Sequence, residues 1–405
     1  MMQTQPLRLA IVVSHPIQYC VPLYRRLAAR KDIELRVFFT WHAGERPQHD
    51  RGFGREVSWD IPLTEGYEYE LVPNISRSPG THHFWGIRNA DLVRRVTDWG
   101  PDAVHITGYA FAAHLRAIRG LSRRGIPVLF RGDSHLLNDK RRGLRWVLKR
   151  FLLGHIYRDV RAFLYVGKHN YDYYRAFGVP ESRLFYCPHS IDVDRFAEPN
   201  DELENKARRW REQLGIPEPT KVLLFAGKFE PVKRPIELMS AISRTESNAI
   251  LLMVGNGELE QEVQKLAAKM PERFRVLPFQ NQSVMPVVYR LGDLFVLPSA
   301  SETWGLAVNE ALASGRKVLL SNKVGCAPDV VRSTVEGQVF PWDNWRNFET
   351  ILQRVLSERA DAADLRLRAR DFDISATEKT LCETLAKIAG NNMPKSKDGR
   401  QVGER

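Results

Sequence analysis

The 405-residue chain has few cysteines and no long hydrophobic run. Its four cysteines, Cys20, Cys187, Cys326 and Cys382, lie far apart without a Cys-x-x-Cys spacing, so neither a disulfide framework nor a zinc site is indicated. No apolar run approaches the ~18–20 residues that cross a bilayer, and the first residues lack a signal-peptide pattern. We therefore expect the chain to stay in the cytoplasm.

Two further patterns are missing. No repeat of solenoid length is visible, which argues against a repeat array. No Asp-x-Asp pair stands at the end of a strand-like run, where it would hold a divalent ion. The sequence therefore predicts a site without a metal.

The charge is distributed unequally along a chain of ordinary globular composition, with 43% hydrophobic and 27% charged residues. Residues 1–190 hold 29 Lys and Arg against 17 Asp and Glu, whereas the remainder holds 31 of each, so the whole net charge of +12 belongs to the first half. Such a basic surface suits nucleic acid, anionic lipid or an acidic small substrate, and charge alone does not choose among them.

Strand-like apolar runs alternate with helical ones in both halves, which predicts βαβ units and parallel sheets. We expect a Rossmann-like domain over 1–190, a second over 191–374 and a last helix over 375–390. The polar end, 391–405, has no core-forming residues and is expected to be disordered. Predicted strands cover 7–13, 35–39, 103–106, 127–130, 162–166, 222–226, 250–254, 275–277, 294–297 and 317–320.

The most informative motif follows a strand-like run and combines two glutamates with the start of a helix. If the helix begins near Gly305, Glu302 lies in the loop before it and Glu310 on its second turn, on either side of the amides of Leu306 and Ala307. Amides in a helix's first turn attract phosphate. In open parallel sheets, ligands bind at the edge formed by the carboxyl ends of the strands, which is where this motif would lie. A carboxylate there is suited to accepting hydrogen bonds from hydroxyls. A sugar nucleotide offers both chemical groups.

This motif resembles the signature of the retaining glycosyltransferases of family 4, also called glycosyl transferases group 1. Their pattern is like Glu-x-Phe-Gly-Leu-x-x-x-Glu-Ala-x-Ala-x-Gly, and residues 302–315 match it with Trp304 in place of Phe. The resemblance implies an α/β fold of the GT-B type: two Rossmann-like domains with parallel sheets facing an interdomain cleft, and a C-terminal helix crossing back to the N-terminal domain.

The resemblance also implies a function: transfer of a sugar from a nucleotide-diphosphate sugar to an acceptor hydroxyl, in the assembly of a cell-surface polysaccharide or glycolipid. No cofactor is expected, because the nucleotide sugar is a substrate. Glu310 would hold ribose hydroxyls and Glu302 sugar hydroxyls. The remaining donor-binding residues of the motif would be Trp304, Gly305, Leu306 and Ala307.

Two lysines, Lys228 and Lys233, follow another strand-like run, and a departing nucleoside diphosphate needs cations at this edge. The family has Arg where Lys228 stands and Gly where Arg234 stands. Phe279 matches only by position the strand end where the family's nucleotide base rests, so it is either a donor contact or part of a core strand.

In the first half, His135 follows a strand where the family often places a histidine that reaches donor sugar and acceptor. The predicted catalytic set is therefore His135, Glu302 and Lys233, with Asp133 as an alternative polar contact. His15 and Gln18 either contact the acceptor or belong to a turn set by Pro16, with Tyr19 filling the core.

The basic segment 138–153 carries apolar residues at helical spacing. Such a helix either lies on anionic lipid, which a lipid-linked acceptor would favour, or packs its apolar face into the core. A competing hypothesis for the whole chain is a basic adaptor without catalysis that binds membrane or nucleic acid. Intact Lys233, Glu302 and Glu310 argue against it, and no nucleic-acid partner is expected. The apolar residues of the segment are Leu144, Val147, Leu148 and Phe151.

Overall fold

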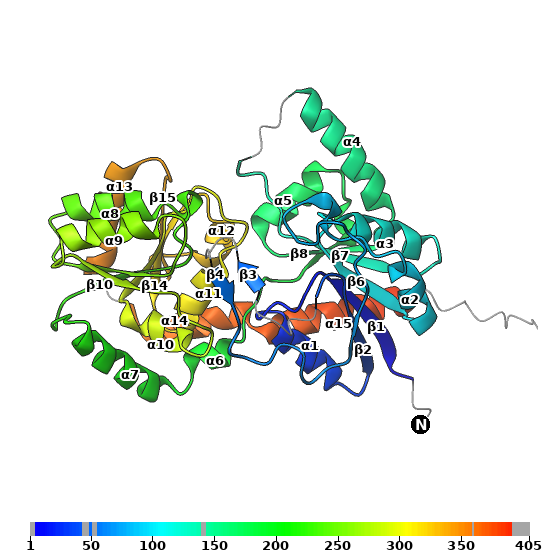
Figure 1. Cartoon of the computed structure of the whole chain (residues 1–405), viewed down its shortest axis with the longest axis horizontal. Helices are drawn as coiled ribbons and strands as arrows, with labels where there is room; N and C mark the ends of the chain where they lie inside the picture. The colour runs from blue at the N-terminus through cyan, green and yellow to red at the C-terminus, as the bar shows by residue number, and fades with distance from the viewer. Residues whose placement is uncertain (1–4, 43–47, 51–54, 139–142, 359, 391–405) are drawn as a thin grey trace, which may run out of the picture.

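The computed structural model describes residues 5–42, 48–50, 55–138, 143–358 and 360–390 (Figure 1). It contains two parallel sheets flanked by helices, one in each half of the chain. The first has seven strands in the order β5-β2-β1-β6-β7-β8-β9, and the second six in the order β12-β11-β10-β13-β14-β15. The predicted pair of parallel α/β domains is confirmed. The tail predicted to be disordered, 391–405, lies outside the described residues.

The five inner strands of the first sheet are buried along most of their length, as expected for a parallel sheet covered on both faces, whereas its two edge strands are not. They are β1 (Leu7–Val13), β2 (Ile33–Phe39), β5 (Tyr69–Leu71), β6 (Ala103–Thr107), β7 (Val128–Arg131), β8 (Ala162–Tyr165) and β9 (Leu184–Tyr186). The accompanying helices are α1 (Val21–Ala28), η1 (Phe84–Gly86), α2 (Leu92–Trp99), α3 (Ala112–Ser122), α4 (Leu144–Arg158), α5 (Lys168–Ala176) and η2 (Glu181–Arg183).

An antiparallel hairpin, β3 (Gln48–Asp50) with β4 (Arg55–Val57), lies between the two domains in Figure 1. It extends from the first domain toward the second.

The second sheet consists of β10 (Val222–Ala226), β11 (Ile250–Val254), β12 (Phe274–Leu277), β13 (Leu294–Leu297), β14 (Lys317–Ser321) and β15 (Gly337–Phe340). Helices of this half are α6 (Val193–Ala197), α7 (Asn200–Gln213), η3 (Pro231–Lys233), α8 (Pro235–Arg244), α9 (Glu260–Lys269), α10 (Met285–Leu291), α11 (Leu306–Ala313), α12 (Ala327–Val330), α13 (Trp345–Ser357), α14 (Ala362–Ala369) and η4 (Arg370–Phe372). All strand pairs in these two sheets are parallel, so the carboxyl ends of the strands of each sheet lie at one edge.

The last helix, α15 (Ile374–Gly390), returns to the first domain, where it lies beside α1 in Figure 1. Its apolar side chains Leu381 and Leu385 join the core around β1 and β2. Its Glu378 carboxylate accepts hydrogen bonds from Arg26 at 2.6 Å and Arg30 at 3.0 Å. The chain therefore connects its domains twice.

Hydrogen bonds across the cleft hold the two carboxyl edges together. The Lys168 amide donates to the Asp329 carboxylate at 3.0 Å, and the Lys323 ammonium donates to the Leu137 carbonyl at 2.6 Å. The described interdomain contacts lie at the edge where ligands of such sheets bind.

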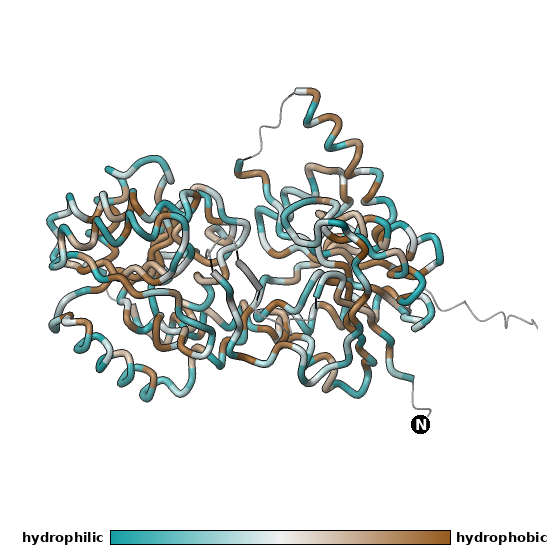
Figure 2. The backbone as a smooth tube through the Cα atoms, in the orientation of Figure 1, coloured by the Kyte–Doolittle hydropathy of each residue, from teal (hydrophilic) through white to brown (hydrophobic). Residues whose placement is uncertain are grey.

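Helix α4 begins at Leu144 and projects from the first domain, with hydrophobic positions visible along it in Figure 2. The four apolar side chains named above are all exposed: Leu144 by 82%, Val147 by 61%, Leu148 by 64% and Phe151 by 77%. The interpretation that these side chains pack in the core is therefore wrong. Residues 139–142 of the basic segment lie outside the described residues. Among the helices that the structure describes, none has the length and apolarity to span a bilayer.

Candidate functional site

The site forms where α11 begins, directly after β13. Gly305 has a φ of 97°, a left-handed conformation that favours glycine, and a Cβ on it would meet Glu302, Val324 and Leu297 at 3.2–3.3 Å. This turn lets the helix start immediately at Leu306. First-turn amides have no intrahelical acceptor. The loop just before this helix end, which is predicted to bind an anion, contacts His135 of the first domain through the Glu302 carbonyl.

The three predicted catalytic residues lie together beside this turn. The Lys233 ammonium hydrogen-bonds the Glu302 carboxylate, and both side chains are mostly buried, with 21% and 16% exposed. His135 Nε2 lies 3.1 Å from the Glu302 carbonyl oxygen. The contact joins the first domain to the loop that carries the predicted sugar-binding carboxylate.

The hydrogen bonds of His135 determine its tautomer. The Leu137 amide donates to Nδ1 at 3.2 Å, so the proton lies on Nε2, which donates to the Glu302 carbonyl. Burial lowers the pKa of His135. The ring is therefore neutral near pH 7 and acts here as a hydrogen-bond donor.

Glu310 lines a second part of the site, a pocket of about 320 Å³. Its carboxylate accepts a hydrogen bond from the Tyr289 hydroxyl at 2.5 Å, and burial raises its pKa to about 7. Both domains contribute to this pocket. Its lining residues are Gln18, Trp59, Ala226, Gly227, Lys228, Val254, Gly255, Phe279, Gln280, Gln282, Met285 and Glu310.

The structure thus brings Lys228, Phe279 and Glu310 into one pocket, as expected of donor-binding residues. It also brings in Gln18, which was predicted either to contact the acceptor or to belong to a turn. Gln18 therefore lies in the same pocket as the predicted donor-binding residues.

The side chain of Trp304 points into the interior rather than into the pocket, which corrects its prediction as a donor contact. It is 2% exposed, its Nε1 donates to Asn309 at 3.3 Å, and its ring packs near Phe372. A Cβ on Gly167 would approach the indole to 2.5 Å. The indole, which is larger than the phenyl ring usual in the family pattern, fits because the first domain has Gly167 at this contact.

The other first-domain candidates lie in two separate places. His15 stacks on His42 at 5.1 Å, and burial, followed by the charge of His42, lowers its pKa to about 4. Asp133 lines a cavity of about 130 Å³ together with Arg131, His105 and other residues at the carboxyl ends of the first sheet. Their proposed contacts with the acceptor stay predictions.

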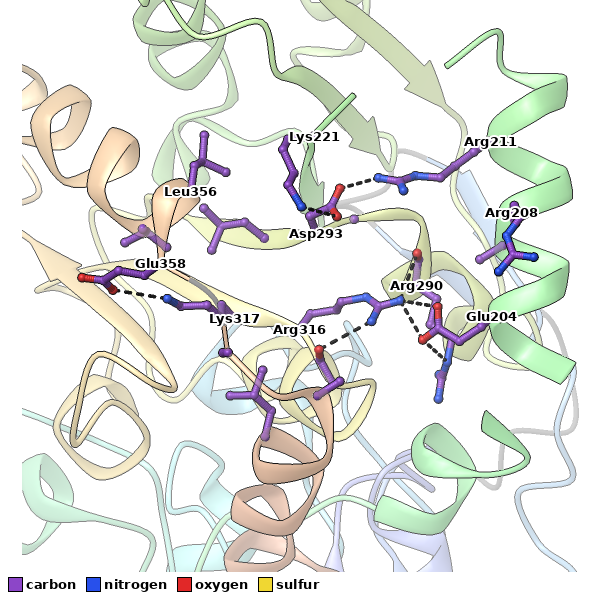
Figure 3. A pocket seen from close by; sticks show the side chains of 18 of the residues that line it. Glu204, Arg208, Arg211, Lys221, Arg290, Asp293, Arg316, Lys317, Leu356 and Glu358 are labelled. Carbon is purple, nitrogen blue, oxygen red and sulfur yellow. Dashed lines mark hydrogen bonds and ion pairs between the residues drawn. The ribbon is translucent and has the colours of Figure 1, made fainter. Parts of the chain in front are cut away.

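A larger cavity, of about 790 Å³, lies at the opposite ends of the strands (Figure 3). Its charged side chains pair with one another: Arg211 with Asp293 at 2.5 Å, and Lys317 with Glu358 at 3.4 Å. Because these strand starts are far from the edge where Glu302 lies, we interpret the cavity as a structural ion-pair network. Among the described residues, no three His, Cys, Asp or Glu side chains form a group that would hold a metal ion.

Two residues at the site were not predicted from the sequence, Tyr289 and Trp59. Tyr289 lies on α10 and reaches Glu310 only through packing, and Trp59 comes from the loop after β4 in the other domain. Neither belongs to a motif with fixed spacing, so only the tertiary structure identifies them.

Together these features define a two-domain α/β protein with a pocket, lined by residues of both domains, near the ion pair of Lys233 and Glu302. A family model described as glycosyl transferases group 1 matches residues 206–372, and one described as glycosyltransferase family 4 matches residues 18–195. The chain belongs to the group 1/family 4 glycosyltransferases.

Curated relatives match over part of their length. D-inositol 3-phosphate glycosyltransferase of Xylanimonas cellulosilytica is 28% identical over 205 residues, 49% of this chain and 49% of the relative. Sulfoquinovosyl transferase of Arabidopsis thaliana is 30% identical over 256 residues, 61% of this chain and 48% of the relative. The chain thus spans about half the length of these relatives.

Solved structures share the fold at low sequence identity. A glycosyltransferase from Rickettsia africae matches with a TM-score of 0.71 at 15% identity, covering 96% of this chain and all of that one. Anabaena HepE, solved with UDP and glucose, matches with a TM-score of 0.68 at 14% identity, covering 94% of this chain and 100% of its own. The predicted GT-B fold is confirmed.

Proposed function

We propose that the protein is a retaining glycosyltransferase that moves a sugar from a nucleotide-diphosphate sugar to an acceptor hydroxyl. The observation that carries this proposal is the arrangement of Lys233, Glu302 and Glu310 around the start of α11. The names of the curated relatives and the UDP-bound Anabaena structure support a nucleotide-sugar donor.

We assign each part of the donor to the residues whose chemistry suits it. Glu310 accepts hydrogen bonds from ribose hydroxyls, and the base lies beside Phe279 in the same pocket. The diphosphate lies between the first amides of α11 and the two lysines, Lys228 and Lys233. Glu302 then faces the hydroxyls of the transferred sugar.

Lys233 connects the sugar and phosphate parts of this arrangement. Its ammonium contacts the Glu302 carboxylate from the side of β10, and their mostly buried position strengthens the interaction. The same cation therefore keeps the sugar-binding carboxylate in place and neutralises charge on the departing diphosphate. Removing it would affect both binding and the chemical step.

In the proposed reaction the acceptor oxygen bonds to the anomeric carbon on the face from which the diphosphate departs. The bond between that carbon and the phosphate oxygen breaks, and the leaving phosphate takes the acceptor's proton. Lysines and amides meet the developing charge, so no metal ion or cofactor is required. Full activity in the presence of EDTA supports this step, and loss restored by Mg²⁺ contradicts it.

We extend the proposal to a lipid-linked acceptor at the cytoplasmic face of an anionic membrane. Helix α4 exposes its apolar stripe, contains no acidic residue, and exposes Arg145 and Arg150 beside the stripe. The segment before it borders the site, because the Asn138 amide lies 3.4 Å from the Ala300 carbonyl. A basic helix with exposed apolar side chains is suited to binding anionic lipid surfaces.

Liposome co-sedimentation tests the membrane surface. We expect the protein to bind vesicles with anionic lipid in a salt-sensitive way. The double variants R145Q/R150Q and L148S/F151S should each weaken this binding. The matched control is R123Q/R124Q, which removes the same charge from the exposed end of α3. Wild-type chain that ignores anionic vesicles at low salt, or variants that bind like the control, would contradict the proposal.

Thermal-shift titration with UDP-, GDP-, dTDP- and ADP-sugars tests the donor. A ligand at 100 times its dissociation constant adds about 2.7 kcal/mol of stability. We expect one nucleotide class to stabilise the protein and its sugar to be turned over. Binding without hydrolysis or transfer, with any of a range of acceptors, would favour the inactive adaptor instead.

A further inference from the structure

A loop of the first domain, residues 58–60, is hydrogen-bonded to the second domain beside the pocket that Glu310 and Lys228 line. The Asn281 side-chain amide donates to the Ser58 carbonyl at 2.7 Å. The Ser283 amide donates to the Asp60 carboxylate at 3.2 Å, and the Ser283 hydroxyl donates to it as well. These bonds fix the loop across the cleft at both of its ends.

Between these two anchors, Trp59 lines the pocket that contains Glu310 and Lys228. Its ring lies 6.2 Å from that of Phe279, with the planes at 64°. The pocket thus has two aromatic walls and, elsewhere in its lining, a carboxylate and a lysine. A nucleoside diphosphate offers a matching set of groups: a flat base for the aromatic rings, ribose hydroxyls for the carboxylate and phosphates for the lysine.

We propose that Trp59 is a nucleotide-binding residue, with its indole forming a wall against which the donor's base packs. The inference rests on the proposed function and adds to it a donor contact supplied by the acceptor-side domain. Asp60 is a positioning residue, because it acts through Ser283 to hold Trp59 over the pocket. Stacking of a base on an aromatic ring stabilises binding by ~1–3 kcal/mol.

The bonds of Ser58 and Asp60 to the second domain hold the indole at the pocket. In the same arrangement of the two domains, His135 contacts the Glu302 loop. A nucleotide that packs against Trp59 therefore stabilises this arrangement.

Isothermal titration of the full-length protein with free UDP, GDP, dTDP and ADP tests the inference. For the nucleotide that binds, W59A is expected to raise Kd by between about fivefold and a hundredfold. W59F retains a ring and is expected to bind within a few-fold of wild type. The control is W85F, which alters an exposed tryptophan outside the pocket.

Two readouts separate base packing from a merely structural contact. Nucleotide should quench tryptophan fluorescence in wild type and in W85F, and the quench should be largely lost in W59F. The W59F measurement also tests the role of Trp59 if W59A does not fold. D60N should weaken binding less than W59A, and W59A/D60N should bind like W59A alone, since Asp60 acts through Trp59.

The two proposals fail differently. Wild-type protein that binds none of the four nucleotides would overturn both. If wild type binds one, a W59A variant of equal affinity, or an undiminished quench in W59F, overturns the role of Trp59 and leaves the proposed function standing.

Discussion

At the scale of single residues, Glu310 determines how the site responds to pH. Its carboxyl group is buried against the Tyr289 hydroxyl, and burial raises its pKa to about 7. In the ligand-free protein, the proton that Glu310 retains favours the folded state below its ordinary pKa of 4.5. This contribution is lost as the pH rises from 4.5 through 7.

Nucleotide binding should have the opposite dependence. Ribose hydroxyls donate to the ionised carboxylate, so the affinity for the nucleoside diphosphate should fall as the pH is lowered from 8 to 6 and Glu310 takes up its proton. Titration calorimetry at pH 6, 7 and 8 measures this. The diphosphate's own titration is common to wild type and E310Q, so the part of the slope due to Glu310 is the difference between them. Identical slopes would contradict the assignment.

The two glutamates should also differ in what their loss affects. We predict that E310Q weakens binding of the free nucleoside diphosphate tenfold or more, since a hydrogen bond to a charged group in a desolvated site is worth about 1.5–3 kcal/mol. E302Q should leave that binding nearly intact and lower kcat, because Glu302 faces the sugar. Binding titrations and turnover of both variants decide, and equal losses of nucleotide affinity would refute the division of roles.

Arg234 stands where the family pattern has glycine, and contacts with its neighbours offset the backbone strain that this causes. It adopts a left-handed conformation with φ 59°, which explains why glycine is usual there. Its guanidinium lies over the rings of Trp342 at 5.1 Å and Trp345 at 4.8 Å, and bonds Glu237 at 3.0 Å. These contacts stabilise the strained turn that delivers Lys233.

At the scale of elements, α4 combines a buried end with an exposed stripe. Leu153 is 3% exposed in the first-domain core, whereas Leu148 is 64% exposed. L153A should therefore lower the free energy of unfolding by about 2–5 kcal/mol. L148A should change it by less than about 0.5 kcal/mol. Denaturant unfolding of this pair measures the difference, and equal losses would show that the stripe is covered in solution.

Long buried strands were predictable from the sequence, whereas of the four edge strands only β12 was predicted, as 275–277. The runs at 222–226 and 250–254 match β10 and β11 residue for residue, because strands covered on both faces are continuously apolar. β5 and β9 have three residues each and lie at the sheet edges, where no periodic pattern can develop. The apolar stripe of α4 was visible, but its exposure depends on what packs nearby.

The candidate site divides in the same way. Glu302 and Glu310 belong to a motif whose spacing matches one loop and one helix, so their placement at the start of α11 could be predicted. The direction of the Trp304 side chain could not, because it depends on Gly167 in the other domain. The approach of Trp59 to Phe279 likewise joins segments 220 residues apart and leaves no local signal.

At the scale of the whole molecule, α15 attaches the end of the chain to the first domain. E378A removes the carboxylate that Arg26 and Arg30 share, and hydrogen exchange across 374–388 should become roughly tenfold faster or more. E383A is the matched control, since Glu383 is 66% exposed and pairs with Lys379 at 4.0 Å. Similar exchange in both variants would show that apolar packing alone holds the helix.

The two connections and the cleft contacts hold the domains together at the proposed site. In the proposed function, the second domain holds the donor, and the first supplies the acceptor side and Trp59. The most direct test of the central claim is turnover of a panel of nucleotide sugars, followed by NMR of the released or transferred sugar. We predict that one donor yields free nucleoside diphosphate and a product that keeps the donor's anomeric configuration, and that E310Q and K233Q abolish this. An inverted product would contradict retention, and no turnover of any nucleotide sugar would contradict the account as a whole.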